Sequence, residues 1–307
     1  MDFIQKAYFT SILINTPGEI REDDLAFAIE QSAADLALII LPKITSSKFE
    51  KARDLVGVCR IHQTVRTIDI EETMKNMSRR ETRRRVNSIN RGFSYDTTNE
   101  NSAFYGFYDN MYIPTMQIRY GTAARTVSIG TAYNELFKKG HLFRIFLDDA
   151  WIAGSVCQID ESNKILNARL IGVQKGDETL KQQGAQNFVY HAILDWACAV
   201  PHIDTVDFQG CEPFLTKGTF QYKKRFGTRA IIPNNSFNEF NLIMRVKHLT
   251  PCVRHFLINN PSIVLTEFNQ LAARYFYDSA NPPRTDIPYE CEGLEHKIIV
   301  SLDDWYE

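Results

Sequence analysis

The sequence predicts an α/β protein whose core is a mixed sheet with flanking helices. Strand-like apolar segments occur at residues 142–147, 151–159, 164–173 and 205–208, and the spacing of apolar side chains predicts an amphipathic helix over residues 185–199. This helix stands between two of the strands. Strands and helices in this order outline an α/β core.

The first part of the chain predicts a smaller α/β lobe. Residues 23–34 suit a helix, residues 36–41 a buried strand that Pro42 ends, and residues 48–55 a second helix. We expect a strand at residues 65–70 to close this lobe.

A basic helix is predicted next, over residues 71–90. Ser78 is expected to cap its second half, because a serine hydroxyl accepts hydrogen bonds from the amides of a first helical turn. The positive charges come from Arg79, Arg80, Arg83, Arg84 and Arg85. Such a face is either simply solvated or binds anions such as an acidic carrier, an RNA backbone or a lipid phosphate.

The rest of the chain predicts further strands and helices. Residues 101–112 suit an aromatic helix, and Asp148 and Asp149 form the turn of a hairpin. A glycine-bearing loop at residues 176–184 leads into the helix at 185–199. The pattern continues with strands at 230–232 and 240–246, a helix ending near Pro261, and an appended segment at 262–307.

These changes of pattern predict three domains. They are an N-terminal lobe at residues 1–72, a main domain at 73–240, and a C-terminal extension at 241–307 that packs on the first lobe or on a partner. The sequence leaves the oligomeric state open.

Composition excludes several classes of protein. With 44% hydrophobic and 23% charged residues and a net charge of -2, the chain is an ordinary globular protein and not a general nucleic-acid coat. Its six cysteines show no C-x-x-C pair, so we expect no disulfide framework, no metal site and a cytoplasmic location. The longest apolar run, residues 36–41, is too short to span a bilayer. No G-x-S-x-G, H-E-x-x-H, P-loop or G-x-G-x-x-G motif occurs.

Residues 66–229 resemble the GNAT acyltransferases, and in particular their FemAB-like branch, which includes peptidoglycan-bridge and cellulose-biosynthesis enzymes. The resemblance lies in several stretches taken in order: Thr67–Ile70, Met77–Arg91, Phe104–Tyr108, Ala185–Ala197, Asp207–Gly210 and Tyr222–Gly227. It implies two GNAT-like lobes, the first degenerate, and an acyl or aminoacyl group moved from a carrier to an amine. The donor would be acyl-CoA, acyl-carrier protein or aminoacyl-tRNA, with no tightly bound cofactor. The acceptor would be an amine on a small molecule, a peptide or a lipid-linked precursor.

Acyl transfer to an amine needs a slot for the carrier and a group that removes a proton. The resemblance implies that the strands at residues 165–173 and 205–208 splay apart, with Gly172 either a bulge or a plain turn glycine. Asp207 is the candidate base, or else a residue that caps its own loop, and Gln209 could orient the acceptor. Tyr222 could protonate the leaving group, or it only packs.

Two groups of residues are candidates for holding the donor. The helix start at Gln182, Gln183, Gly184 and Ala185 offers amides for a phosphate, although an ordinary loop-to-helix junction would look the same. The corresponding pyrophosphate loop of ordinary GNAT enzymes is shorter and less acidic than residues 174–185 here, which puts tight CoA binding in doubt. A second group of cations suits a phosphate or carboxylate, or forms a solvated hairpin: Lys223, Lys224 and Arg225.

The aromatic segment would form one wall of the acceptor cleft. Tyr105, Tyr108 and Arg119 are the candidate acceptor-binding residues there, with core packing as the alternative. Two other functions compete with a general N-acyltransferase. One is a GNAT-fold binding module that has lost its chemistry, and the other is tRNA-dependent peptide-bond formation, favoured by the arginine helix and opposed by the acidic pI.

Overall fold

The computed structural model describes residues 22–48, 50, 54–67 and 70–306, and its chain divides into two compact units. Unit 1 comprises Met1–Ile61, Gly210–Gln221 and Ala230–Glu307, and unit 2 comprises His62–Gln209 and Tyr222–Arg229. By these contacts, residues 62–72 belong with unit 2 and residues 230–240 with unit 1. That the chain forms separate domains with boundaries after residues 72 and 240 remains a prediction.

Unit 2 is built on a mixed sheet, as the sequence predicts. The seven-stranded sheet has the order β4-β5-β6-β7-β8-β3-β9. Strands β4 to β7 pair antiparallel, whereas β7 and β8 pair parallel. The strands are β4 (Phe93–Thr98), β5 (Gly140–Leu147), β6 (Ala150–Asp160), β7 (Ile165–Val173), β8 (Thr205–Cys211), β3 (Ile61–Arg66) and β9 (Arg229–Ile231). The hairpin turn between β5 and β6 is confirmed, since Asp148 and Asp149 have φ of 49° and 62°.

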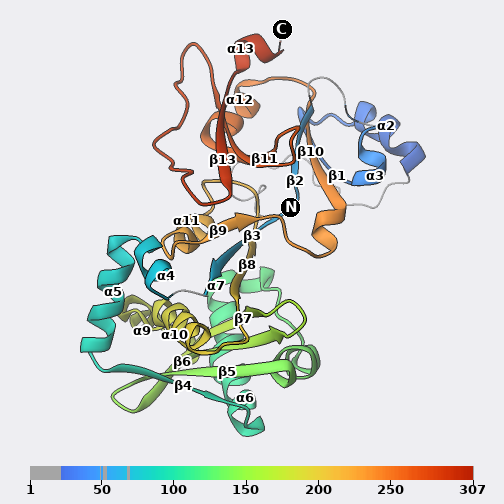
Figure 1. Ribbon diagram of the computed structural model, residues 1–307. Coiled ribbons are helices and arrows are strands. Elements are labelled where there is room, and N and C mark those ends of the chain that lie inside the picture. The colour runs from blue at the N-terminus through green and yellow to red at the C-terminus, as the bar shows by residue number, and fades with distance from the viewer. Residues whose placement is uncertain (1–21, 49, 51–53, 68–69, 307) are drawn as a thin grey trace. The chain divides into compact units, whose positions relative to one another are not determined.

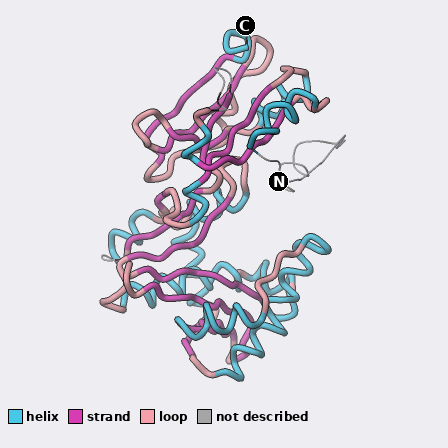
Figure 2. The backbone as a smooth tube through the Cα atoms, turned by 90° about the vertical axis from the view of Figure 1, so that its right-hand side faces the viewer, coloured by secondary structure: helices cyan, strands magenta, loops and turns pink. Residues whose placement is uncertain are grey.

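Helices cover both faces of this sheet (Figures 1 and 2). Helix α10 (Ala185–Ala199) packs through Phe188, Val189 and Ile193 on one face. On the other face lie α6 (Asn101–Phe107), the π-helix η1 (Tyr108–Tyr112) and α7 (Ile113–Tyr120), which pack on Leu142, Val156 and Leu170. Four short helices follow α7: η2 (Gly121–Ala123), α8 (Ile129–Thr131), η3 (Ala132–Leu136) and η4 (Phe137–Lys139).

The basic helix is divided at Ser78 into α4 (Ile70–Asn76) and α5 (Arg79–Asn90). The predicted cap is confirmed, because the Ser78 hydroxyl accepts from the Glu81 amide at 3.3 Å. The strand expected at residues 65–70 lies earlier, at Ile61–Arg66, and α4 begins at Ile70. Residues 68–69 of that expectation lie outside the described residues.

Two segments of unit 2 and its border differ from the expectation. Residues 176–184 are not a loop throughout, because η5 (Gln174–Gly176) and α9 (Glu178–Gln183) form there. The side chain of Asp177 starts α9 by accepting from the amides of Thr179 and Leu180 at 2.7 and 3.1 Å. The basic-aromatic run is not a hairpin, since it contains helix α11 (Gly218–Lys224).

Unit 1 contains two three-stranded sheets. Strands β1 (Leu36–Pro42) and β2 (Asp54–Val58) flank β10 (Phe240–Val246) in an antiparallel sheet. The second sheet consists of β11 (Ser262–Leu265), β12 (Leu271–Tyr277) and β13 (Leu294–Ser301). The helices of this unit are α2 (Glu22–Gln31), α3 (Lys43–Ser46), η6 (Ser236–Glu239), α12 (Pro251–Asn259) and α13 (Leu302–Tyr306).

The N-terminal expectations hold in part. The helix expected at residues 23–34 and the strand at 36–41 are present as α2 and β1. The helix expected at 48–55 is wrong at its end, where Asp54 and Leu55 belong to β2, and residues 49 and 51–53 lie outside the described residues. Among the described helices, none has the length and apolar character needed to cross a membrane.

Candidate functional site

Strands β7 and β8 separate where a carrier slot is predicted. Their parallel pairing runs from Ile165↔Thr205 to Asn167↔Asp207 and then stops, although β7 continues to Val173 and β8 to Cys211. The expected divergence of these two strands is therefore confirmed. Beyond Asn167↔Asp207, β7 and β8 no longer pair with each other, so the backbone N–H and C=O groups on their facing edges are not joined by this ladder. We call the stretches Ala168–Val173 and Phe208–Gln209 the strand divergence.

The bulge in β7 lies at Arg169, and the assignment of a bulge to Gly172 is wrong. Val156 pairs with Leu170 while its neighbour Cys157 pairs with Ala168, so Arg169 is the extra residue. Gly172 pairs regularly with Gly154. Its lack of a side chain serves packing instead, because a Cβ there would lie 2.6 Å from the backbone of Met111 and Tyr112 in η1.

A carboxylate and an imidazole form a buried pair at the start of the strand divergence. Nδ1 of His62, on β3, lies 2.7 Å from Oδ2 of Asp207 on β8, and the two residues are 7% and 8% exposed. The other carboxylate oxygen of Asp207, Oδ1, accepts a hydrogen bond from the backbone amide of Gln209 at 2.6 Å. This arrangement fixes Nδ1 as the nitrogen that faces the carboxylate and leaves Nε2 for a second partner.

Both partners face away from α10. Val206 and Phe208 belong to the core beneath α10, so Asp207 between them points to the opposite face of the sheet. Val65 belongs to the same core, and strand alternation therefore places His62 on the face of Asp207. This is the face covered by α6, η1 and α7.

Polar side chains bridge the two strands just past the last ladder pair. Arg169 donates to Oε1 of Gln209 at 2.8 Å, and Nε2 of Gln209 donates to Oδ1 of Asn167 at 3.1 Å. Gln209 has a φ of 67°, and its carbonyl accepts from Nζ of Lys223 at 2.7 Å. The structure thus brings three of the predicted site residues together: Asp207, Gln209 and Lys223.

Tyr222 lies on the other face of β8 from Asp207. Its ring packs on Tyr190 and Phe226 in the core beneath α10, and its hydroxyl accepts from Asn187 at 3.1 Å. Burial raises the pKa of Tyr222, with the neighbouring Tyr190 adding to the effect. The structure does not bring this predicted acid to the predicted base.

The polar neighbours of Tyr222 belong to a buried cluster around Glu81. This fully buried carboxylate accepts from Arg84 at 2.7 Å and from Asn187 at 2.8 Å. His191, also fully buried, has its Nε2 3.9 Å from Glu81 Oε2, and within the described residues neither ring nitrogen has a hydrogen-bond partner. Burial, helped by the charges of Arg85 and Arg84, lowers the pKa of His191 to about 3, so the ring is neutral.

The predicted phosphate seat lies between two helices. Gln182 and Gln183 form the last turn of α9, and Gly184, at φ 102°, joins it to α10, which Ala185 begins. The Gly184 amide donates within that turn, to the Lys181 carbonyl at 3.0 Å. Hydrogen bonds from the Leu180 and Thr179 amides lower the pKa of Asp177 at the other end of α9. A carboxylate therefore occupies the start of α9, the first α-helix after β7.

The remaining cations and aromatic residues are placed as follows. Arg225 has a guanidinium nitrogen 4.0 Å from Glu81 Oε1, and Lys224 ends α11. Tyr105 is 44% exposed and stacks on Tyr133 with ring centroids 5.7 Å apart, whereas Arg119 lies over the Tyr120 ring. The hydroxyl of Tyr108 is engaged in the fold, since it donates to the Val127 carbonyl at 2.7 Å.

Sequence reasoning missed His62, Asn167 and Arg169. His62 stands in a short buried strand with no motif around it, and its partner is 145 positions away. Asn167 and Arg169 interrupt an otherwise apolar strand, and these polar residues are the local signal in the sequence.

Comparisons with known proteins give structural likeness only. No protein-family model matches the chain, and no curated protein matches it by sequence. Among solved structures it is similar to FemX, at 11% identity over 71% of this chain and 74% of that chain, with a TM-score of 0.46. It is also similar to L-PGS from Bacillus licheniformis, at 8% identity over 76% of each chain, with a TM-score of 0.43.

The strand order, the parallel β7–β8 pair and its early end define the architecture independently of these likenesses. The chain has an α/β fold built on mixed sheets with flanking helices.

Proposed function

We propose that this protein is an N-acyltransferase that moves an acyl or aminoacyl group from a carrier to an amine without a covalent enzyme intermediate. The observation that carries the proposal is the end of the β7–β8 ladder at Asn167↔Asp207, next to the Asp207–His62 pair. An extended carrier arm with amide groups can hydrogen-bond to strand edges that have lost their partners, in the manner of an added strand. Its carbonyl would then be presented to the acceptor near this pair.

His62 is the proposed base and Asp207 the residue that orients it. With Nδ1–H directed at the carboxylate, Nε2 carries the lone pair and takes a proton from the amine as the C–N bond forms. The same proton then passes to the oxygen or sulfur of the departing carrier as its bond to the carbonyl carbon breaks. Asp207 stabilises the imidazolium between these two steps.

The start of α9 favours a donor that does not place a diphosphate there. Asp177 caps that helix and Glu178 lies in its first turn, so a diphosphate would meet two carboxylates and would have to displace the cap. Acyl-carrier protein and aminoacyl-tRNA fit this arrangement better than acyl-CoA, because their phosphates need not sit at this turn. The acceptor in this proposal is an amine on a small molecule, a peptide or a lipid-linked precursor, in the cytoplasm.

A donor panel tests the proposal. The full chain is incubated with acyl-CoA, acyl-carrier protein, acyl-pantetheine and aminoacyl-tRNA, each with a panel of primary amines, and amide products are detected by mass spectrometry. We expect amide formation, with the KM for acyl-pantetheine within about threefold of that for acyl-CoA. Failure of every donor to react or bind would overturn the proposal. A CoA preference of about 100-fold would overturn only the choice of donor.

One observation favours a second function, a binding module without chemistry. The Arg169–Gln209–Asn167 bridge crosses the strand divergence and would have to yield to an incoming carrier arm. In that case the chain would bind an acyl carrier in the same panel and release no amide.

A further inference from the structure

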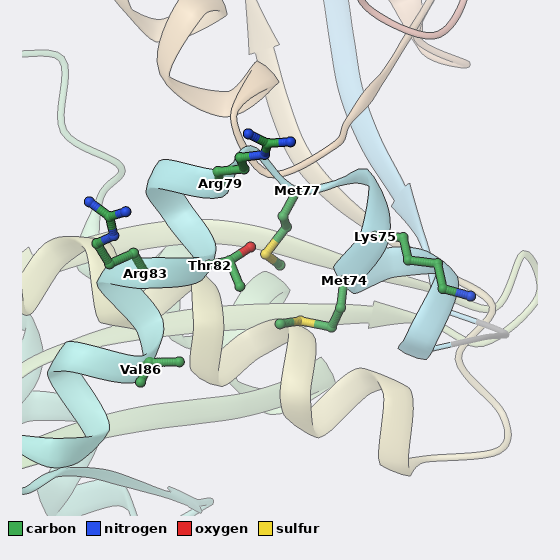
Figure 3. Close-up of a pocket in the computed structure, with 7 residues that line it drawn as sticks. All are labelled: Met74, Lys75, Met77, Arg79, Thr82, Arg83 and Val86. Atoms are coloured by element: carbon green, nitrogen blue, oxygen red, sulfur yellow. The ribbon is translucent and has the colours of Figure 1, made fainter.

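A pocket of about 450 Å³ lies between α4 and α5, away from the strand divergence in sequence and sharing no residue with the Asp207–His62 pair. It is lined by Met74, Lys75, Met77, Arg79, Thr82, Arg83 and Val86. Figure 3 shows the side chains of Met74, Met77 and Val86 directed into the space between the helices, whereas Arg79, Arg83 and Lys75 point outward in three different directions. The volume is within the range of small-molecule sites.

The lining separates into an apolar part and a cationic part. Met77 is buried, whereas Val86 is 48% exposed, so apolar surface continues from the floor of the pocket to its mouth. Methionine side chains are flexible and fit chains of varied shape. Arg79, Arg83 and Lys75 are exposed and have no ion pair in the described part of the chain. Of the other three arginines of α5, Arg84 pairs with Glu81 and Arg85 with Asp195.

We propose that this pocket binds a single acyl chain that ends in a phosphate or carboxylate. The methionines and Val86 would cover the chain, and the exposed Arg83 would pair with its anionic end. RNA fits the pocket less well, because none of the lining side chains is an aromatic ring on which a base could stack.

Alkyl phosphates below their micelle concentration test the assignment by isothermal titration calorimetry with the full chain. We expect decyl phosphate to bind with one-to-one stoichiometry and at least about tenfold more tightly than hexyl phosphate, because burial of each added methylene contributes. Decanol has the alkyl chain but no phosphate, and inorganic phosphate has no alkyl chain. Each should bind at least about tenfold more weakly than decyl phosphate.

Two neighbouring arginines provide the matched variants. Arg83→Gln removes a cation from the pocket, and Arg80→Gln removes one from the same helix outside it. We expect the first to weaken decyl phosphate binding about tenfold and the second by less than about twofold. Val86→Asn, at an exposed position, should weaken decyl phosphate binding more than hexyl phosphate binding.

Several results would overturn the assignment. Equal effects of the two arginine substitutions would show a diffuse positive surface and no site. Binding to anionic phospholipid vesicles or to RNA without binding of monomeric decyl phosphate would assign the face to a membrane or to nucleic acid. None of these results bears on acyl transfer, because the pocket and the strand divergence share no residue.

Discussion

At the scale of single residues, the pair of His62 and Asp207 determines which nitrogen of the ring can act as a base. A 2.7 Å contact between Nδ1 and the carboxylate holds the imidazole in one orientation, and the Asp207 carboxylate is held in turn by the Gln209 amide. Such a chain of contacts positions a base without further side chains. His62 and Asp207 are therefore the first residues to mutate in a test of the proposed base.

Removing either partner should lower the rate without a matching loss of binding. We expect His62→Gln and Asp207→Asn each to reduce kcat by about 10²–10⁴-fold and to leave KM within about threefold. The measurement is steady-state kinetics with the donor and acceptor that the panel identifies. Both substitutions approximately preserve the size of the side chain, and this limits their effect on folding.

Tyr222→Phe is the control for this pair. Because its hydroxyl contacts Asn187 on the opposite face of β8, the substitution should change kcat by less than about threefold. If Tyr222→Phe instead lost as much activity as His62→Gln, the acid would be Tyr222 after all and the assignment of roles above would be wrong.

At the scale of elements, the packing of η1 on β7 depends on a glycine. The backbone of Met111 and Tyr112 approaches Gly172 so closely that any side chain would have to push η1 away. Tyr112 and Tyr108 in turn hold the Val127 backbone through their hydroxyl groups. A displacement of η1 would thus reach the loop that leads to α8.

Gly172→Ala should lower the free energy of unfolding of unit 2 by about 1–3 kcal/mol, because the added methyl group meets backbone atoms. Denaturant titration followed by the fluorescence of Trp151 and Trp196 measures it, in a Trp305→Phe background. Gly130→Ala is the matched control, since a Cβ there has no atom within 4 Å. Equal stability of Gly172→Ala and the control would contradict the packing argument.

Elements with strong local signals could be predicted from the sequence, and those set by distant contacts could not. Helix α10 was predicted at Ala185–Ala199 from its apolar spacing alone, and Ser78 from its position before a polar helix. The flanking Gly176 and Gly184 predict a loop where helix α9 forms, although Asp177 is a regular cap of that helix. His62 could not be found, because one sequence does not say which strand will lie beside β8.

At the scale of the whole molecule, each unit has apolar cores of its own. The clusters beneath α10 and beneath α6–η1–α7 consist of unit 2 residues, and the clusters around Phe256, Tyr275 and Ile243 consist of unit 1 residues. Trp151 and Trp196 lie in unit 2 and therefore report on its unfolding. The buried polar groups of unit 2 then determine how its stability responds to pH.

His191 should make unit 2 less stable in acid. Its folded pKa of about 3 is below the ordinary value of 6.5, so the unfolded chain binds a proton that the folded one excludes. The stabilisation is complete above about pH 6.5 and is lost as the pH falls towards 3, by up to about 1.4 kcal/mol per pH unit.

Replacement of His191 by leucine should flatten this dependence between pH 6.5 and 4, measured by the same fluorescence titration at a series of pH values. His248→Gln, at an exposed position, should leave the slope unchanged. An unaltered slope in His191→Leu would mean that another group governs the acid response.

The bulge at Arg169 also limits how this protein can vary in length. Leu166 and Ala168 face the core beneath α10, whereas Leu170 faces the core beneath α6–η1–α7. Because Arg169 is the extra residue, its excision would let Leu170 follow Ala168 in strict alternation and would leave Leu170 and Ile171 on the faces that they occupy now. A one-residue deletion in β7 is therefore tolerable at the bulge, whereas an insertion in the regular part of the strand would move the following side chains to the opposite face. The surface turn at residues 161–164 can change in length without this effect.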